Sequence, residues 1–383
     1  MLAGCTFDYY LPSSNQCPTA PKRNTLEAAS LAVHFSDAVL LVIGVVNANR
    51  KSEPMQVIKH HGWAVRTKAL LKRGLAHLPW LRRMVQRSPM LASTARTITT
   101  TLSSREEKVL HYLDRSGLGL EIGPSHNPIA PKRQGFNVHI LDHLSADGLR
   151  QKYADHARFG VRIENIEEVD FVWNGEDLRD LIGQTASYDW IISSHVIEHI
   201  PDVITHLQQC AALLKPTGRM SLVIPDMRYC FDALGSINTT GDFLDAYGQK
   251  RKRPSPGAIF DHFASACQRN DKITWDATEP IRSQALMHDL ADAKALWQRA
   301  YDSAEYIDTH CWRFTPASFQ LLIYDLQFLG LLPLQIIGFF ETSGCEFYAT
   351  LGYQEAGAGI APSRLKLLEN LQAELTKGVG SVA

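Results

Sequence analysis

Short apolar runs alternate with longer amphipathic segments between residues 106 and 225. The apolar runs are each four to five residues long and occupy 118–122, 138–141, 190–193 and 220–224. Short, continuous apolar strands separated by helices are typical of a parallel sheet that helices cover on both faces. The pattern therefore predicts an α/β fold with a mainly parallel sheet.

Two segments carry clear helix signals. Pro201 and Asp202 precede an apolar stripe at helical spacing, and Pro216-Thr217-Gly218 ends it. Thr315-Pro316 supplies an N-cap and a first-turn proline for a second apolar stripe, which Gly330 ends. Both segments are predicted to be helices.

Two further apolar runs, 334–340 and 345–351, follow the second of these helices. Thr342-Ser343-Gly344 lies between them. A glycine in a short connection between two strand candidates is typical of a hairpin. We therefore expect an antiparallel last strand that closes an otherwise parallel sheet.

The alternation pauses over residues 227–309, and this stretch is predicted to be an insertion after the fifth strand. Ligands bind at the carboxyl ends of parallel strands, and we expect the insertion to lie over that edge. The chain then divides into an N-terminal extension (1–105), a main domain (106–352) and a C-terminal helix or tail (353–383).

The N-terminal extension ends in a basic segment. Residues 54–105 contain ten Lys or Arg and no Asp or Glu, and apolar residues recur there at helical spacing. We expect a basic amphipathic helix with a solvated charged face. The alternative is weak contact of residues 59–105 with an anionic membrane surface or a phosphate-bearing glycolipid. The longest aliphatic run, 38–46, is too short to span a bilayer.

Charge and cysteine content exclude several classes of protein. Lys and Arg number 39 and Asp and Glu 40, so a net charge of −1 gives no attraction of the whole molecule to nucleic acid. The seven cysteines contain no C-x-x-C pair, which argues for free thiols and against a disulfide or structural zinc framework. We therefore expect a cytoplasmic protein, with a peripheral position at the inner membrane surface as the alternative. The oligomeric state stays open.

The first apolar run ends in Glu121-Ile122-Gly123, and the second is followed by Asp142. An acidic residue at the tip of the second strand of a β-α-β unit is placed to accept hydrogen bonds from both hydroxyls of a ribose. A glycine at the end of the first strand lets the backbone approach a ligand closely. The alternative is that Asp142 only caps a turn.

Two further motifs follow in the chain: Asp189-x-Ile-x-x-Ser-x-x-x-Glu198-His199 and Leu214-Lys-Pro-x-Gly-Arg219. Together with Glu-x-Gly and the later Asp, they resemble the motifs of class I S-adenosylmethionine-dependent methyltransferases of the broad group called type 11. The resemblance covers about residues 106–226 and 310–352. It implies a Rossmann-like, seven-stranded sheet and S-adenosyl-L-methionine as the cofactor.

The resemblance also implies which residues hold the cofactor. Gly123 would lie against its amino-acid part, Asp142 would bind the ribose and Asn174 would lie near the adenine. Ser125 and Asn127 stand where the family usually has further glycines, which changes the loop between the first strand and the ligand. The implied cofactor-binding residues are Glu121, Gly123, Asp142, Asn174, Ser194 and His195.

Residues 308–316 and 344–348 resemble, more weakly, bacterial methyltransferases associated with polysaccharide synthesis. A sugar hydroxyl, or a hydroxyl of a small molecule, is therefore the expected acceptor. Its proton needs a base, and His310 and His262 are the candidates. Asp308 precedes His310 by two residues and is expected to orient its ring, and Trp312 is a candidate to stack on a sugar.

Two other functions remain open. His195-Val196-Ile197-Glu198-His199 matches the H-x-x-E-H signature of a zinc hydrolase, in which two histidines on one helical face bind the metal. His195 directly follows a strand, however, so the motif is expected to begin in a loop, and no metal is assigned. The second alternative is a non-catalytic binding module that keeps the methyltransferase fold.

Overall fold

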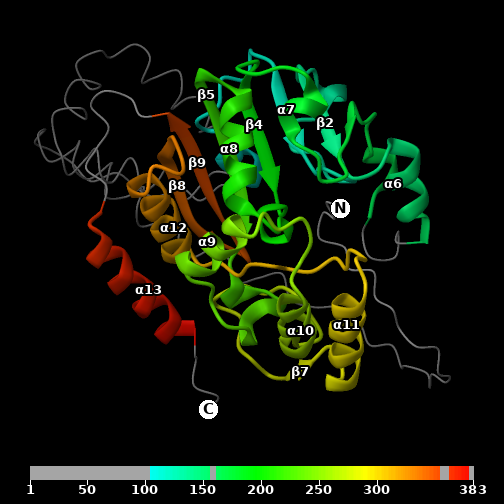
Figure 1. Cartoon of the computed structure of the whole chain (residues 1–383), viewed down its shortest axis with the longest axis vertical. Coiled ribbons are helices and arrows are strands. Elements are labelled where there is room, and N and C mark those ends of the chain that lie inside the picture. Colours follow the sequence, from blue (N-terminus) through cyan, green and yellow to red (C-terminus); the bar gives the residue numbers. More distant parts are fainter. Residues whose placement is uncertain (1–103, 156–160, 354–361, 379–383) are drawn as a thin grey trace, which may run out of the picture. The chain divides into compact units, whose positions relative to one another are not determined.

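The computed structural model describes residues 104–155, 161–353 and 362–378. The predicted basic helix of the N-terminal extension lies outside the described residues. The described part forms one seven-stranded sheet with helices on both faces (Figure 1). Its strands are β1 (Gly119–Ile122), β2 (Val138–Asp142), β3 (Phe171–Val172), β4 (Tyr188–Ser194), β5 (Leu214–Pro225), β8 (Leu334–Ser343) and β9 (Glu346–Tyr353).

The strand order is β3-β2-β1-β4-β5-β9-β8. The first five strands are parallel, with Ile122 opposite both Leu141 and Ser193. β9 pairs antiparallel with β5 on one side and with β8 on the other. The predicted mainly parallel sheet with an antiparallel last strand is confirmed.

Two element boundaries differ from the prediction, and one strand was not predicted. β5 begins at Leu214, so the segment expected to end the preceding helix already belongs to the strand. The hairpin turn lies at Gly344 and Cys345, one residue later than expected, because Gly344 has a φ of +67° and supplies the left-handed backbone of the turn. β3 is only two residues long, which is too short for an apolar run to mark it.

Helices cover both faces of the sheet. Alternate strand residues point to opposite faces, and Leu120, Ile191 and Leu222 belong to one buried cluster while Trp190 and Ile192 belong to another. The first cluster includes side chains of α7, α8 and α12, and the second includes α5. The helices of the main domain are α5 (Arg105–Leu110), α6 (Ala146–Lys152), α7 (Leu178–Ile182), α8 (Val203–Leu213) and α12 (Pro316–Phe328).

The two helices with clear sequence signals form as predicted. The Asp202 side chain accepts the Thr205 N–H at the start of α8. Thr315 and Ser318 form a capping box at the start of α12, with Pro316 in the first turn. No described helix is long and apolar enough to cross a bilayer.

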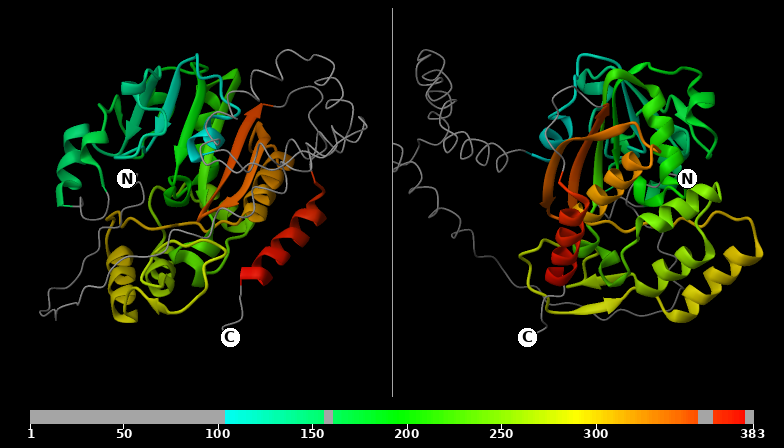
Figure 2. Two further views of the ribbon diagram at one scale, coloured as in Figure 1. Left: turned by 180° about the vertical axis from the view of Figure 1, so that it is seen from behind. Right: turned by 60° about the vertical axis from the view of Figure 1, so that its left-hand side comes forward.

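The insertion forms a small helical layer beside the main sheet (Figure 2). The end of the insertion reaches the segment that follows β4, where Asp308 contacts His199. His310, which directly follows the insertion, contacts Glu198 in the same segment. This end of the insertion therefore lies at the carboxyl end of β4, as expected. Its elements are α9 (Thr240–Gly248), α10 (Pro256–Ser265), β6 (Cys267–Arg269), β7 (Gln284–Leu286) and α11 (Leu290–Asp302).

The C-terminal segment forms α13 (Arg364–Gly378), which packs on α12. Arg364 binds the carboxylate of Asp325 at 2.7 Å, and the Glu374 carboxylate accepts the Ala317 N–H. Leu367 is buried in the contact. The expected C-terminal helix is therefore present and belongs to the main domain.

Glu346, at the start of β9, joins three parts of the main domain. Its carboxylate binds Arg105 of α5 at 2.7 Å and His195, which follows β4, at 2.8 Å. Burial by itself would raise the pKa of Glu346, but the hydrogen bond and charge of His195 and the Arg105 guanidinium lower it to about 2. A carboxylate whose pKa is lower in the folded than in the unfolded chain stabilises the fold above about pH 4.5 and loses that contribution as the pH falls towards 2.

We expect Glu346→Gln to lower the free energy of unfolding at pH 7 by about 2–3 kcal/mol, because it removes the negative partner of two cationic groups in a mostly buried cluster. The variant should also lose less stability than the wild type between pH 5 and pH 3. Urea unfolding at several pH values measures both effects. Glu369→Gln is the control, because Glu369 pairs with Lys366 on the surface and contributes little. Equal effects of the two substitutions would contradict the role given to Glu346.

Candidate active site

The carboxyl ends of β1, β2 and β4 bring most of the predicted cofactor residues to one edge of the sheet. The Gly123 N–H donates to the Leu141 carbonyl, and the His195 N–H donates to the Val223 carbonyl. Gly123 has a φ of +66°, and His195 has a φ of +52°, which is rare for a residue with a side chain. The chain therefore turns sharply at the ends of β1 and β4, and such strained positions concentrate at functional sites.

Glu121 organises the turn after β1. Its buried carboxylate accepts the N–H groups of Ile129 at 2.6 Å and Ala130 at 3.1 Å. Burial raises the pKa of Glu121 to about 7, and the two N–H donors offset only part of that shift. Its contacts are with the chain itself, so Glu121 shapes the loop between Gly123 and Ala130.

Asp142 lies at the carboxyl end of β2, where the sequence predicted it, and is fully buried. One carboxylate oxygen accepts the Ser125 N–H at 2.9 Å, and the other contacts the backbone N–H and Nδ1 of His143 at 2.8 and 2.7 Å. Asp142 therefore ties the ends of β1 and β2 together. A carboxylate has about four acceptor positions, so it has room for a further donor beside these three.

Ser194 ends β4 and His195 follows it, and Arg105 and Glu346 lie beside them. The Ser194 hydroxyl accepts a hydrogen bond from Arg105 at 2.7 Å, and His195 Nδ1 lies 3.6 Å from a Glu198 oxygen. Their positions relative to one another are thus set by charged groups from α5 and β9. No motif in the sequence points to Arg105 or Glu346 as these partners.

Asn174 follows β3 and is exposed. Its backbone N–H donates to the Glu176 carboxylate at 2.7 Å. Its neighbours Trp173 and Gly175 line a cavity, whereas Asn174 is not among the described residues around it. The role of Asn174 near the adenine stays a prediction.

His310 is buried and its Nδ1 lies 2.6 Å from the Asp232 carboxylate. The prediction that Asp308 orients the His310 ring is wrong, because Asp308 binds His199 Nδ1 at 3.0 Å instead. Burial by itself would raise the pKa of Asp232, but the charge and hydrogen bond of His310, with the charge of Arg313, hold it well below its usual range. An ionised carboxylate therefore orients the His310 ring.

His262 is also buried and lies beside the ring of His310, with 5.7 Å between the ring centroids. Burial and the neighbouring His310 lower its pKa to about 3. An imidazole with so low a pKa is a weak proton acceptor. The structure thus brings both candidate bases together. They differ because His310 contacts the Asp232 carboxylate, whereas burial lowers the pKa of His262.

Three residues that the sequence did not assign to the site also lie in it: Glu198, His199 and Asp232. A ligand atom from each of Glu198, His199 and His310 lies within 4.8 Å of those from the other two. Glu198 and His199 were visible in the sequence as part of the methyltransferase motif that begins at Asp189 and of the H-x-x-E-H signature, but neither motif gave them a role in the site. The metal pair of that signature does not form, because His195 precedes the 3₁₀ turn Ile197–His199 and binds Glu346 instead.

The aromatic residue expected to stack on a sugar is used for packing. Trp312 is buried, donates from its indole to the Ile200 carbonyl at 2.6 Å and stacks on Phe243. Aromatic side chains with a polar atom commonly pack in this way. Trp312 therefore holds the return from the insertion against the segment after β4.

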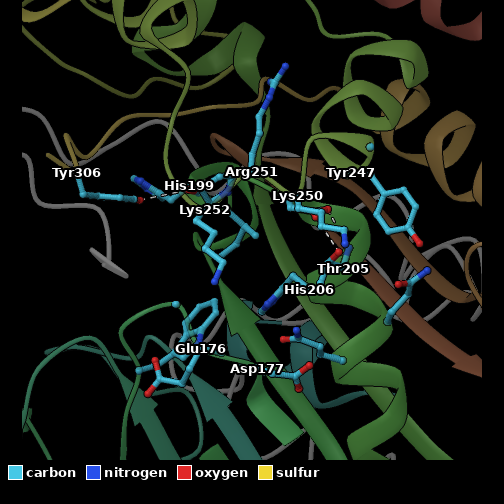
Figure 3. Close-up of a pocket in the computed structure, with 18 residues that line it drawn as sticks. Glu176, Asp177, His199, Thr205, His206, Tyr247, Lys250, Arg251, Lys252 and Tyr306 are labelled. Atoms are coloured by element: carbon cyan, nitrogen blue, oxygen red, sulfur yellow. Dashed lines mark hydrogen bonds between the residues drawn. The ribbon is translucent and has the colours of Figure 1, made fainter. Parts of the chain in front are cut away.

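A cavity of about 570 Å³ lies beside this group, between the segments that follow β3 and β4 and the basic segment after α9 (Figure 3). His199 and Tyr306 lie next to one another at its wall, and the Tyr306 hydroxyl donates to the His199 carbonyl at 3.5 Å. Its volume is in the range of small-molecule sites. The charged residues in its lining are Glu176, Asp177, Asp202, Lys250, Arg251 and Lys252.

The residues at the strand ends suit S-adenosyl-L-methionine. Asp142 offers a carboxylate for ribose hydroxyls, and positive φ at Gly123 and Ser125 shapes a sharp turn after β1. A dinucleotide would instead require a glycine-rich phosphate loop, and Ser125 and Asn127 replace those glycines. The donor set therefore matches a ribose-bearing cofactor without phosphate.

Comparisons with known proteins agree with this assignment. A family model described as a methyltransferase domain matches residues 95–328, which is more than half of the chain. No curated protein sequence matches.

Solved structures show distant similarity. The PH0226 protein of Pyrococcus horikoshii has 13% identity and a TM-score of 0.32, over 70% of this chain and 93% of its own. The CcbJ methyltransferase of Streptomyces caelestis has 13% identity and a TM-score of 0.31, over 66% and 97%. On the match to the family model, the chain belongs to the class I S-adenosylmethionine-dependent methyltransferases.

Proposed function

We propose that this methyltransferase transfers the methyl group to a hydroxyl of a sugar, a glycan or another small molecule. The observation that carries the proposal is the buried His310–Asp232 pair at the carboxyl end of β4. A hydroxyl is a poor nucleophile until its proton leaves, and an imidazole held by a carboxylate is suited to assist that step. S-adenosyl-L-methionine supplies the methyl group as a sulfonium.

The chain's own residues have distinct tasks in this proposal. Asp142 and the turn at Gly123 hold the ribose and the amino-acid part of the cofactor. Asp232 orients His310, and His310 activates the acceptor hydroxyl. The C–O bond forms as the C–S bond breaks, S-adenosylhomocysteine leaves, and the hydroxyl proton passes to Nε2 of His310.

The cavity beside His199 is the proposed entry for the acceptor. Tyr247, Tyr306 and Trp173 offer aromatic surface in its lining, while Lys250 and Lys252 offer positive charge (Figure 3). The same lining also contains Glu176, Asp177 and Asp202. Aromatic surface with charged groups of both signs suits a polar small molecule such as a sugar. The weaker resemblance to polysaccharide-associated methyltransferases supports the same class of acceptor.

Asp142→Asn should weaken the binding of S-adenosyl-L-methionine by about 10- to 150-fold, since a hydrogen bond to a charged group is worth about 1.5–3 kcal/mol. Calorimetric titration measures the change. Asp189→Asn is the matched control, because Asp189 lies at the amino end of β4, where it accepts the Leu118 N–H and binds Lys215. Unchanged affinity in a folded Asp142→Asn variant would remove this carboxylate from the cofactor site.

His310→Asn should lower turnover by about a hundredfold or more and leave cofactor affinity intact. The assay follows radiolabelled methyl transfer to polysaccharide precursors, nucleotide sugars and small hydroxyl compounds. His262→Asn should have a much smaller effect, because its low pKa makes that ring a weak base. A larger loss with His262→Asn than with His310→Asn would reverse the two roles, and no methylated hydroxyl in any acceptor class would refute the proposed function.

A further inference from the structure

We infer that Glu198, His199 and His310 bind a divalent transition-metal ion. The three side chains are buried, and one ligand atom of each lies within 4.8 Å of the other two. Metal–ligand bonds of about 2.0–2.2 Å require donors about 3–4 Å apart. Binding therefore needs the three side chains to move together by about 1 Å.

The surroundings of the two histidines match those of metal ligands. His199 Nδ1 contacts the Asp308 carboxylate at 3.0 Å, and His310 Nδ1 contacts the Asp232 carboxylate at 2.6 Å. Metal-binding histidines almost always donate their other ring N–H to a carboxylate or carbonyl, which sets the remaining nitrogen as the ligand atom. His310 Nε2 lies 3.9 Å from Glu198 Oε1, on the side away from Asp232. Both histidines contact a carboxylate through Nδ1, and both lie beside Glu198. The three side chains therefore have the arrangement expected of metal ligands.

The backbone holds the ligands in place. The Glu198 carbonyl accepts the N–H groups of Cys311 at 2.7 Å and Trp312 at 3.2 Å. The segment that carries Glu198 and His199 is thereby fixed to the segment that carries His310. Ligands on such a supported scaffold bind metal without a large ordering cost.

The ligand types indicate the class of ion. Two imidazole nitrogens and one carboxylate oxygen suit Mn²⁺, Fe²⁺, Co²⁺ or Zn²⁺ better than Ca²⁺ or Mg²⁺, which prefer oxygen ligands. Three protein ligands leave positions for other oxygens, as in catalytic metal sites. This set differs from the H-x-x-E-H pair of a zinc hydrolase, because His310 takes the place of His195.

Such an ion would bind the acceptor, and this part of the inference rests on the proposed function. His199 lies at the wall of the cavity, so a hydroxyl of a ligand in the cavity can approach the ion (Figure 3). Coordination lowers the pKa of a bound hydroxyl. A hydroxyl bound to the ion would then lose its proton to water in the cavity and take the methyl group as the C–S bond breaks. His310 would activate this hydroxyl as a ligand of the ion and not by accepting the proton itself.

Metal binding by the full-length chain tests the site directly. After chelator treatment, calorimetric titration with Zn²⁺ and absorption spectra with Co²⁺ should show one bound ion per chain. The chain has 15 histidines, so variants must locate the site. His199→Gln and His310→Gln should each weaken binding at least about a hundredfold, and Asp232→Asn by about 10- to 100-fold. His206→Gln, a buried histidine outside the cluster, should bind as the wild type does.

The wild type alone can overturn the inference: no ion bound at stoichiometric amounts excludes the site, whether or not the variants fold. Binding that survives in folded His199→Gln and His310→Gln would also exclude it. Methyl transfer to a hydroxyl by a chain that binds no ion would refute the metal site and leave the proposed function. An ion bound at the site without any methylated hydroxyl would refute the proposed function and leave the site.

Discussion

The candidate site depends on a backbone contact between two distant segments. The Glu198 carbonyl, just after β4, accepts hydrogen bonds from Cys311 and Trp312, where the chain returns from the insertion. This contact places His310 beside Glu198 and His199 in a region closed to solvent. A buried carbonyl needs a donor, so the fold of the insertion and the geometry of the site are determined together.

The buried carboxylates of this region stay ionised only because cationic groups contact them. Glu346 keeps its charge because Arg105 and His195 contact it, and Asp232 keeps its charge because His310 and Arg313 contact it. Removing a partner from a buried ion pair leaves a charge that is costly to solvate. The polar groups at the carboxyl edge are therefore held in place by charge as well as by packing, which suits a site that must hold its ligands in a fixed orientation.

Two groups of residues at the carboxyl edge of the sheet are suited to different tasks. The ends of β1 and β2 offer Gly123 and Asp142, which are suited to a ribose-bearing cofactor. The end of β4 and the insertion offer imidazoles and carboxylates, which are suited to an acceptor hydroxyl or a cation. His195, after β4, contacts both Glu346 and Glu198 and so connects the start of β9 to the second group. This division explains why an α/β sheet with ordinary strand-end motifs needs an insertion to complete the site.

The sequence by itself determined the sheet, the two capped helices, the hairpin and the strand-end positions of Gly123 and Asp142. These features depend on local spacing, since apolar periodicity and capping residues act over a few neighbours. β3 was not predicted, because a strand of two residues is too short to show an alternation of apolar and polar positions. Only the tertiary structure decided that Asp232 and not Asp308 orients His310, and that Glu198, His199 and His310 lie together. Those partners are set by how the insertion folds back onto β4, and residues 78 or more positions apart leave no local pattern that links them.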